Sequence, residues 1–508
     1  MGTEATTEEE HTPEYEFATN TSAHGFARVA DNKYTLSRVI WVLLILTGFG
    51  VATWQITMRF IAYYKYDTTT KITMTFSKTL QFPAVTICNV NKYLKSQLDQ
   101  TDIDFLDQAT SMLNPYDYAY NPYSYEDYSY YDYGGSGDAA YGVPPAAPSG
   151  NTGSVNIDDL MANISLWYPG GFDFANFTKE KGWQLTDTNI HCEFKGVKCN
   201  ISKSFTPVLT EYGLCYTFNA VPNSKPRVFQ DQPGIGNGLK LIVNIEQSEY
   251  TNKMERGDPI EVGLLFQVHN QSEPPMMETK SLAVPPGFHA YAGVKRTDSA
   301  EMEPPYGICD RASPLKYYSV YTMSACVQEC KLDHMMGNCT CKLLNYPGPG
   351  EVCSPKQIVE CVKPILLEIK KNFTHMCPCK IPCQSVNYET YLSYAKLPSD
   401  ETAPEVAMEY GVAQSDIEKN ILVLDIFFQD LNYVISEQLP AIESSGLISD
   451  LGGQFGLFMG FSLLTLVEFI EFGFTRLILF ICRPKKKKRT ITPVLPKEES
   501  NSKSAFHY

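Results

Sequence analysis

Residues 39–58, VIWVLLILTGFGVATWQITM, carry no charged side chain and lie between Arg38 and Arg59. A helix needs about 20 apolar residues to cross about 30 Å of hydrocarbon, so this stretch predicts a transmembrane helix, extended here to residues 39–64. It begins too far along the chain and is too long for a cleaved signal peptide. Residues 1–38 are then expected to form an amino-terminal segment outside the bilayer.

A second transmembrane helix is predicted at residues 441–482, where a glycine-rich apolar run ends in a half that carries charge. That half contains Glu468, Glu471 and Arg476. Ionisable groups at membrane depth are costly and usually face a partner or a water-filled cavity. Two interpretations stay open, a short helix whose end lies among lipid headgroups and a helix that lines a pore.

The cysteines predict the topology of the chain. Fourteen of the 15 lie between the two spans, and Cys482 lies at the edge of the second. Because paired cysteines belong in an oxidising compartment, residues 65–440 are expected to form an extracellular domain with both termini in the cytosol. The basic tail, residues 483–508, agrees with this orientation. Fourteen cysteines permit seven disulfides, but their number does not assign the partners.

Glycosylation sequons also predict that the segment between the two spans is extracellular. Six Asn-x-Ser/Thr triplets lie between the spans, and they begin at Asn163, Asn176, Asn200, Asn270, Asn338 and Asn372. The net charge of −15 is spread over the large middle segment and the acidic amino terminus. It does not indicate binding to nucleic acid. The expected location is the plasma membrane, with lipid as a partner.

The middle segment mixes strand and helix patterns. Residues 238–245 and 262–268 alternate apolar and polar side chains, which is typical of half-buried strands. Residues 355–371 carry apolar side chains at helical spacing. The fold class is therefore an α+β membrane protein with a disulfide-rich mixed α/β extracellular domain.

A tyrosine-rich insertion is predicted at residues 113–150. Ten tyrosines lie between Tyr116 and Tyr141, interleaved with acidic residues and followed by Gly, Pro and Ala. One interpretation is a structureless surface insertion. The other is an aromatic and acidic surface for a cationic ligand.

The candidate pore lies in the glycine-rich run at residues 452–462. Its four glycines are compatible with close helix packing. Alternatively, Gly460-Phe461-Ser462 interrupts the helix and frees backbone carbonyls that replace part of the hydration shell of an ion. A chain with two spans cannot enclose a pore alone, so the second interpretation requires an oligomer.

The sequence does not predict an enzyme. It contains no Gly-x-Ser-x-Gly, His-Glu-x-x-His or P-loop motif. The two Cys-x-Cys pairs, at residues 339–341 and 377–379, resemble metal ligands, but disulfides explain them better in an oxidising compartment. We therefore expect no cofactor and no bound metal, with Na⁺ as the permeant ion of the channel hypothesis.

Several motifs together resemble those of a known family. They are His24-Gly25, residues 82–89 (FPAVTICN), residues 304–309 (PPYGIC), the cysteine ladder from Cys309 to Cys383, and Gly460-Phe461-Ser462. The chain resembles the degenerin/epithelial sodium channel superfamily, and within it the acid-sensing and peptide-gated (FMRFamide-type) sodium channels. The resemblance covers residues 24–482, apart from the tyrosine-rich insertion.

The resemblance implies a homotrimer or heterotrimer of hand-and-ball architecture. It also implies the disulfides Cys88–Cys215, Cys192–Cys199, Cys309–Cys383, Cys326–Cys379, Cys330–Cys377, Cys339–Cys361 and Cys341–Cys353. A thumb-like helical region at residues 309–383 would contain two helices, near residues 315–336 and 355–371. Its nested disulfides would make it a stiff lever.

The resemblance further implies roles for individual residues. The selectivity filter would be formed by Gly460, Phe461 and Ser462. Cations would be attracted by Asp450 in the outer vestibule, where amiloride-type blockers act, and by Glu468 and Glu471 below the filter. Gating would involve His24, Gly25 and Tyr306.

The implied function is a voltage-insensitive, amiloride-sensitive, sodium-selective channel. The sequence departs from acid-sensing members at positions where they carry acidic residues, namely Arg256, Gly257, Lys363 and Leu367. We therefore expect opening by an extracellular ligand, an amidated neuropeptide being favoured. The alternatives are a proton-gated, a mechanically gated or a constitutive sodium channel. A different class is a two-span adhesion or receptor protein that conducts no ions.

Overall fold

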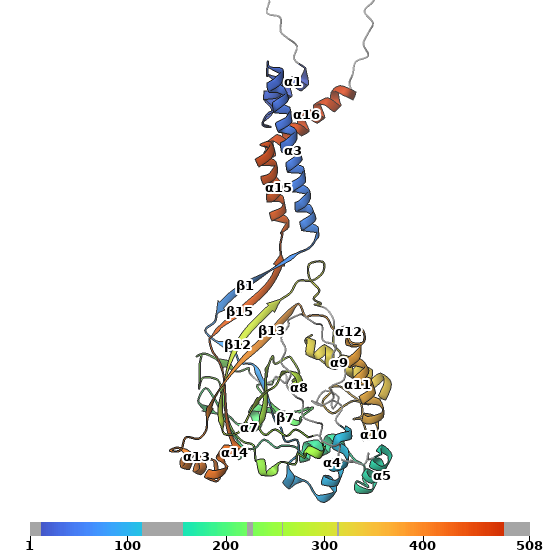
Figure 1. The fold of residues 1–508 in the computed structure, drawn as a ribbon, viewed down its shortest axis with the longest axis vertical. Coiled ribbons are helices and arrows are strands. Elements are labelled where there is room, and N and C mark those ends of the chain that lie inside the picture. Colours follow the sequence, from blue (N-terminus) through green and yellow to red (C-terminus); the bar gives the residue numbers. More distant parts are fainter. Residues whose placement is uncertain (1–11, 114–155, 221–226, 257, 312–313, 482–508) are drawn as a thin grey trace, which may run out of the picture. The chain divides into compact units, whose positions relative to one another are not determined.

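The computed structural model describes residues 12–113, 156–220, 227–256, 258–311 and 314–481 (Figure 1). The chain forms two compact units. The first combines residues 1–67 with residues 440–508, and the second comprises residues 68–439. The tyrosine-rich insertion (except Leu113) and the basic tail fall outside the described residues.

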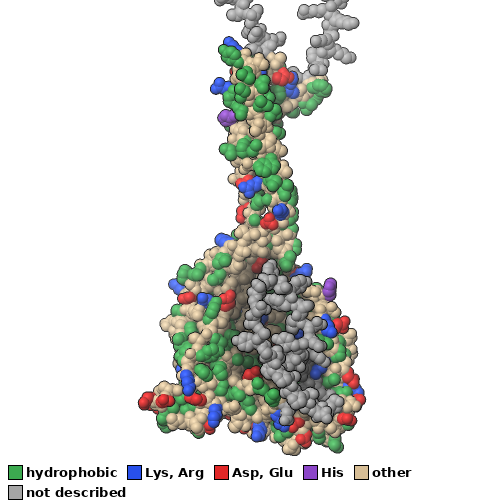
Figure 2. Space-filling model, in the orientation of Figure 1, with side chains coloured by type: hydrophobic (Ala, Val, Ile, Leu, Met, Phe, Trp, Pro, Cys, Tyr) green, Lys and Arg blue, Asp and Glu red, His purple; other side chains and the backbone are tan. Residues whose placement is uncertain are grey.

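The first unit is built on α3 (Thr35–Tyr64), an apolar helix of 30 residues. At about 1.5 Å per residue it is longer than the 30 Å or so of a hydrocarbon core. Only 6% of its most apolar stretch is buried within the chain. Hydrophobic side chains cover much of the visible surface of this unit, as expected for helices that face lipid (Figure 2).

The predicted second transmembrane helix is two helices in the structure. These are α15 (Ser444–Met459) and α16 (Leu463–Ile481), and they are bent by 76° at a short break. Helix α15 packs along α3 through small side chains, since Ala52 is buried and a Cβ on Gly48 would lie 3.0 Å from the carbonyl oxygen of Phe458. Two further helices, α1 (Pro13–Asn20) and α2 (Phe26–Ala30), precede α3.

The second unit is organised around an eight-stranded mixed sheet. Seven strands follow the order β1 (Thr68–Phe76), β15 (Asn432–Pro440), β12 (Phe288–Ala300), β14 (Ile421–Phe428), β9 (Leu239–Asn244), β4 (Ile190–Phe194) and β5 (Val197–Lys198). The eighth, β13 (Gln384–Lys396), pairs antiparallel with β12 along its whole length. Strand β9 alternates buried and half-buried residues, which agrees with the pattern predicted for residues 238–245.

A five-stranded sheet packs against the first. Its order is β11 (Leu282–Val284), β10 (Leu264–His269), β3 (Ala84–Asn89), β7 (Gly213–Phe218) and β6 (Phe205–Thr210), and a separate pair is formed by β2 (Leu80–Gln81) and β8 (Phe229–Gln230). The main core brings together side chains from both sheets, among them Phe266 of β10 and Leu424 of β14, and Phe82 from the segment between β2 and β3; all three have no exposed surface. Strands β3 and β7 are buried along their whole length, so this sheet is a rigid element.

Helices gather beside the sheets around a second core. They are α4 (Gln100–Leu113), α5 (Ile157–Trp167), α6 (Phe174–Lys181), α9 (Met323–Cys339), α10 (Pro355–Gln357), the π-helical turn Ile358–Val362, α11 (Lys363–Lys371) and α12 (Phe373–Met376). Shorter helices are α7 (Ile201–Ser204), α8 (Met277–Lys280), α13 (Ala403–Tyr410) and α14 (Ile417–Asn420). The 3₁₀ turns are Lys95–Gln97, Gln247–Glu249, Met254–Arg256 and Gln414–Asp416.

One predicted helix boundary was wrong. The helix expected near residues 315–336 begins at Met323, because the side-chain oxygen of Thr322 accepts a hydrogen bond from the backbone N–H of Ala325 and caps the helix there. The preceding residues are tied to the helix instead of extending it, since Glu329 accepts hydrogen bonds from the backbone N–H groups of Lys316 and Tyr317.

Seven disulfides cross-link the second unit. They join Cys88 to Cys215, Cys192 to Cys199, Cys309 to Cys383, Cys326 to Cys379, Cys330 to Cys377, Cys339 to Cys361 and Cys341 to Cys353. These are the pairs that the family resemblance implies. Five of them lie between residues 309 and 383. Three of these five, at Cys326, Cys330 and Cys339, tie α9 to residues 361–379. Of the six sequon asparagines, Asn163 and Asn270 are half-buried and the other four are exposed.

The two disulfides outside that region should contribute unequally to stability. We expect the double change Cys88→Ala and Cys215→Ala to lower the free energy of unfolding by about 2 kcal/mol more than Cys192→Ala with Cys199→Ala, because the first bond closes a much longer loop. The sequence separations are 127 and 7 residues. Thermal unfolding of the purified chain measures the difference, and equal midpoints for the two variants would contradict it.

Candidate functional site: the break in the second membrane segment

The break between α15 and α16 begins with a glycine cap. Gly460 adopts a left-handed conformation with φ of +65°, directly after the last residue of α15. Its N–H donates to the carbonyl of Gly456 (3.0 Å), and the N–H of Phe461 donates to the carbonyl of Phe455 (3.2 Å). This is the usual way a helix ends at glycine, because only glycine adopts this conformation without a steric cost.

The break ends with a serine cap. The hydroxyl of Ser462 accepts a hydrogen bond from the N–H of Thr465 (3.2 Å), and the Thr465 hydroxyl accepts one from the N–H of Ser462 (3.0 Å). This reciprocal pair satisfies two of the free donors at the start of α16. Glycine therefore stops one helix and serine starts the next, which explains why these two residue types flank Phe461.

The two caps leave backbone carbonyls available at the break. Among the described residues, the carbonyls of Gly460 and Phe461 accept no hydrogen bond that closes either helix, whereas that of Ser462 accepts one from Leu466. Carbonyl oxygens that are not used by a helix can coordinate a cation. The geometry is compatible with the predicted filter, although a single chain does not form a complete ring of ligands.

The segment before α3 folds back onto this break. The backbone N–H of His24 donates to the carbonyl of Met459 (3.3 Å), and a Cβ on Gly460 would overlap the imidazole ring of His24. Gly25 follows with φ of +93°, and a Cβ there would lie 3.2 Å from Ile45 of α3. His24 and Gly25 thus lie between the break and α3. Three residues predicted from the sequence, His24, Gly25 and Gly460, are therefore neighbours.

Glu468 is held by the same amino-terminal segment. Its carboxylate accepts hydrogen bonds from the hydroxyl of Thr21 (2.9 Å) and from the backbone N–H of Ser22 (2.8 Å), and the Ser22 hydroxyl also contacts Thr465 (2.5 Å). Glu471, in contrast, is exposed and has no hydrogen bond or ion pair with a described residue. The two predicted ion-attracting glutamates therefore differ, since only Glu471 is free to face water.

Aromatic and charged contacts extend this packing along α16. Phe17 of α1 stacks on Phe472 (ring centroids 4.3 Å apart) and meets the edge of Phe469 (5.0 Å). Arg476 forms an ion pair with Glu14. Neither Phe17, Thr21, Ser22 nor Thr465 was singled out from the sequence. Only Thr465 has a local signal, because it follows Ser462 at the spacing of a capping pair.

The remaining predicted residues lie elsewhere. Asp450 of α15 forms an ion pair with Arg59 of α3 (3.5 Å). Tyr306 belongs to the second unit, in a turn where Gly307 leaves no room for a side chain beside Met302, and the N–H of Met302 donates to Gln438 of β15 (3.0 Å). This turn is therefore fixed to β15.

The first unit thus combines one apolar helix that is long enough to cross a membrane with a bent helix pair whose capped break is contacted by the amino-terminal segment. The model of the amiloride-sensitive sodium channel family matches residues 17–472. The chain belongs to this family, within the degenerin/epithelial sodium channel superfamily.

Curated relatives agree. Acid-sensing ion channel 1 of Gallus gallus is 31% identical over 93% of this chain and 86% of the relative. Acid-sensing ion channel 2 of Homo sapiens is 31% identical over 90% of this chain and 85% of the relative. The bile acid-sensitive ion channel of Rattus norvegicus is 31% identical over 91% of this chain and 87% of the relative. These are ion channels, so the chain belongs to a family of sodium channels and not of enzymes.

Gly460→Ala should reduce sodium current by about tenfold or more at equal surface expression. The left-handed conformation costs a non-glycine residue about 1–2 kcal/mol, and about 1.4 kcal/mol shifts an equilibrium tenfold. The added methyl group would also displace His24. Gly473→Ala is the matched control, because a Cβ there meets nothing within 4 Å. Equal currents from both variants would show that the contact between His24 and Gly460 has no role in conduction.

Proposed function

We propose that this chain is one subunit of a plasma-membrane, sodium-selective, amiloride-sensitive and voltage-insensitive channel that opens when an extracellular ligand binds. The observation that carries the conducting part is the capped break at residues 460–462, where two carbonyls accept no helix-closing hydrogen bond from a described residue. A structure that only anchored a receptor would not need this interruption, because an unbroken helix satisfies all of its backbone groups.

The channel requires an oligomer. Each chain supplies one break, so three copies arranged around an axis would bring three sets of carbonyl and hydroxyl oxygens together. Gly460, Phe461 and Ser462 are the filter in this proposal. Glu471 attracts cations below it, while Glu468 mainly anchors Thr21 and Ser22 and so keeps the amino-terminal segment against the filter.

Opening by a ligand is supported by the surroundings of Arg256. Where acid-sensing relatives are expected to carry a carboxylate, this buried guanidinium instead forms ion pairs with Asp107 (2.9 Å) and Asp258 (2.8 Å). This position therefore carries a cation that is held by two carboxylates, and it adds no carboxyl group of its own to an acidic cluster. An amidated neuropeptide is the favoured ligand, and mechanical or constitutive opening is less well supported.

Proton gating is the second candidate, because several relatives are named acid-sensing channels and one carboxyl pair fits that activity. Burial raises the pKa of Glu211, and burial together with the charge of Glu211 raises the pKa of Glu278. Each group therefore takes up its proton at a higher pH than an exposed glutamate. A state in which the pair is protonated gains stability as pH falls through these raised pKa values.

Recording from oocytes that express the chain alone separates the two candidates. We expect amidated peptides to evoke an amiloride-sensitive sodium current at neutral pH, and acid steps without peptide to evoke none. Current on acidification with no response to any peptide would overturn ligand gating. In that case, loss of the acid response in Glu211→Gln would identify the carboxyl pair as the sensor.

Ser462→Ala should change the permeability ratio of sodium to potassium, because it removes a filter hydroxyl and the cap of α16, worth about 1 kcal/mol. Thr47→Ala is the control, since that hydroxyl donates to Leu43 within α3 and is exposed. An unchanged ratio in Ser462→Ala would count against the filter. Normal surface display with no current from the wild-type chain under any condition would favour the adhesion or receptor class.

A further inference from the structure

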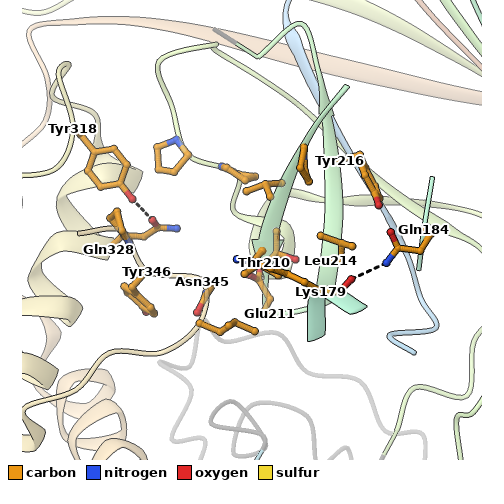
Figure 3. Close-up of a pocket in the computed structure, with 17 residues that line it drawn as sticks. Lys179, Gln184, Thr210, Glu211, Leu214, Tyr216, Tyr318, Gln328, Asn345 and Tyr346 are labelled. Atoms are coloured by element: carbon orange, nitrogen blue, oxygen red, sulfur yellow. Dashed lines mark hydrogen bonds between the residues drawn. The ribbon is translucent and has the colours of Figure 1, made fainter. Parts of the chain in front are cut away.

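A large cavity lies within the second unit, between the hairpin of β6 and β7 and the segments around α9. Its volume is about 820 Å³. Figure 3 shows Leu214 and Tyr216 on the hairpin side and Tyr318, Gln328 and Tyr346 on the opposite side. Cavities of this size usually accommodate a small organic ligand. None of the residues predicted from the sequence as functional lines it.

The walls of the cavity are mainly apolar and aromatic. Three tyrosines are combined with prolines and aliphatic side chains, including Val208, Leu214 and Leu344. Two of the tyrosine hydroxyls already donate hydrogen bonds within the protein, that of Tyr318 to Gln328 and that of Tyr216 to the carbonyl of Trp183. Their rings therefore present fixed apolar faces, which suit an aromatic or aliphatic body and can also stabilise a cation.

Both walls are anchored by disulfides. On the hairpin side, Cys215 of β7 is bonded to Cys88 of β3, and the hydroxyl of Thr210 contacts its sulfur. On the other side, residues 344–347 lie in the loop closed by Cys341–Cys353. A cavity with walls held in this way is preformed, so a ligand loses little binding energy to ordering them.

The cavity is lined by one acidic and one basic side chain, Glu211 and Lys179. Glu211, at the turn between β6 and β7, accepts a hydrogen bond from the backbone N–H of Glu278. Burial raises the pKa of Glu211, although Lys92 and Lys331 act in the opposite direction. A positive group placed against this carboxylate inside the cavity would favour its ionised form. The other charged lining residue, Lys179, is exposed, so water screens its ammonium group.

We propose that this cavity is a binding site for an organic cation with an aromatic body, whose ammonium or guanidinium group pairs with Glu211 while the body packs among Tyr216, Tyr318 and Tyr346. An amphipathic anion is disfavoured because its charge would meet the Glu211 carboxylate. The same chemistry occurs in a free aromatic amine and in the basic and aromatic end of a peptide. The site itself is independent of the proposed function, but its role in opening the channel depends on it.

A bound cation would connect two disulfide-anchored elements. The hairpin belongs to the five-stranded sheet, whereas Gln328 lies on α9, which Cys326–Cys379 and Cys330–Cys377 join to the segment after α11. A ligand that contacts both sides favours the separation of the two elements at which both contacts are made. Binding would therefore stabilise one arrangement of the sheet relative to α9.

The test measures binding directly on the purified full-length chain by calorimetry at neutral pH. The probes are tryptamine, the dipeptide amide Arg-Phe-NH₂, the anion indole-3-propionate, and citrulline-Phe-NH₂ with a blocked amino terminus, which lacks the positive charge. We expect tryptamine or Arg-Phe-NH₂ to bind and the other two to bind at least about tenfold more weakly, since loss of one charge-assisted contact of about 1.4 kcal/mol corresponds to tenfold. Tighter binding of tryptamine indicates a free amine as the source, and tighter binding of the dipeptide indicates a peptide.

Variants assign the binding to this cavity. Glu211→Gln should weaken cation binding by about tenfold, equivalent to about 1.4 kcal/mol, and Asn345→Trp should abolish it by filling the space. Glu246→Gln is the matched control, because Glu246 is another half-buried glutamate and its side chain does not line the cavity. Thermal unfolding identifies any variant that fails to fold. Equal binding to wild type and to both cavity variants, or preference for the anion, would overturn the proposal.

Current recordings separate the site from its role. If the cation binds through Glu211 but no condition evokes current, the site stands and the proposed channel function fails. If a peptide opens the channel equally well in wild type, Glu211→Gln and Asn345→Trp, and neither variant changes cation binding, the channel function stands and the cavity proposal fails.

Discussion

The need to satisfy backbone polar groups inside a membrane governs the first unit. An apolar helix can be interrupted there only if its freed N–H and C=O groups find partners or face water. Gly460 and Ser462 supply the caps on each side of the interruption, and His24 donates to the last carbonyl of α15. The amino-terminal segment is therefore packed against the break, and the position of each depends on the other.

The second unit solves a different problem, that of keeping a large domain rigid without one continuous core. Two sheets share a core, and the helices form another. Disulfides tie α9 to the segments that follow it and tie β3 to β7. A domain built this way can change by movement of stiff parts relative to one another, which is why a cavity between the hairpin of β6 and β7 and α9 is a suitable place for a ligand to act.

Electrostatics divides the charged residues of the chain into anchors and free groups. Glu468, Asp450 and Arg256 are all held by named partners within their own units, so their charges serve structure. Glu471 and Glu211 differ, because the first is exposed and the second is a half-buried carboxyl whose pKa is raised by desolvation. The contrast matters for function, since a charge that already has a partner has little attraction left for an ion or a ligand.

The sequence by itself determined the features that depend on neighbouring residues. Hydropathy located α3 and the bent pair of α15 and α16, and alternation located β9 and β10. The glycine-rich run allowed an interruption at Gly460-Phe461-Ser462 as one of two interpretations. Hydropathy, spacing and capping are local properties. Family resemblance supplied the cysteine pairs that counting left open. Even so, the start of α9 was misplaced, since its cap depends on a single threonine at residue 322.

Only the tertiary structure decided which distant groups meet. Thr21 and Glu468 are 447 residues apart in the chain, and no local pattern marks Thr21 or Ser22 as partners of a membrane glutamate. The cavity likewise draws its walls from β6, β7, α9 and the loop at residues 344–347, which are brought together by packing and disulfides. Such contacts depend on how whole elements fold against one another, and sequence spacing carries no information about them.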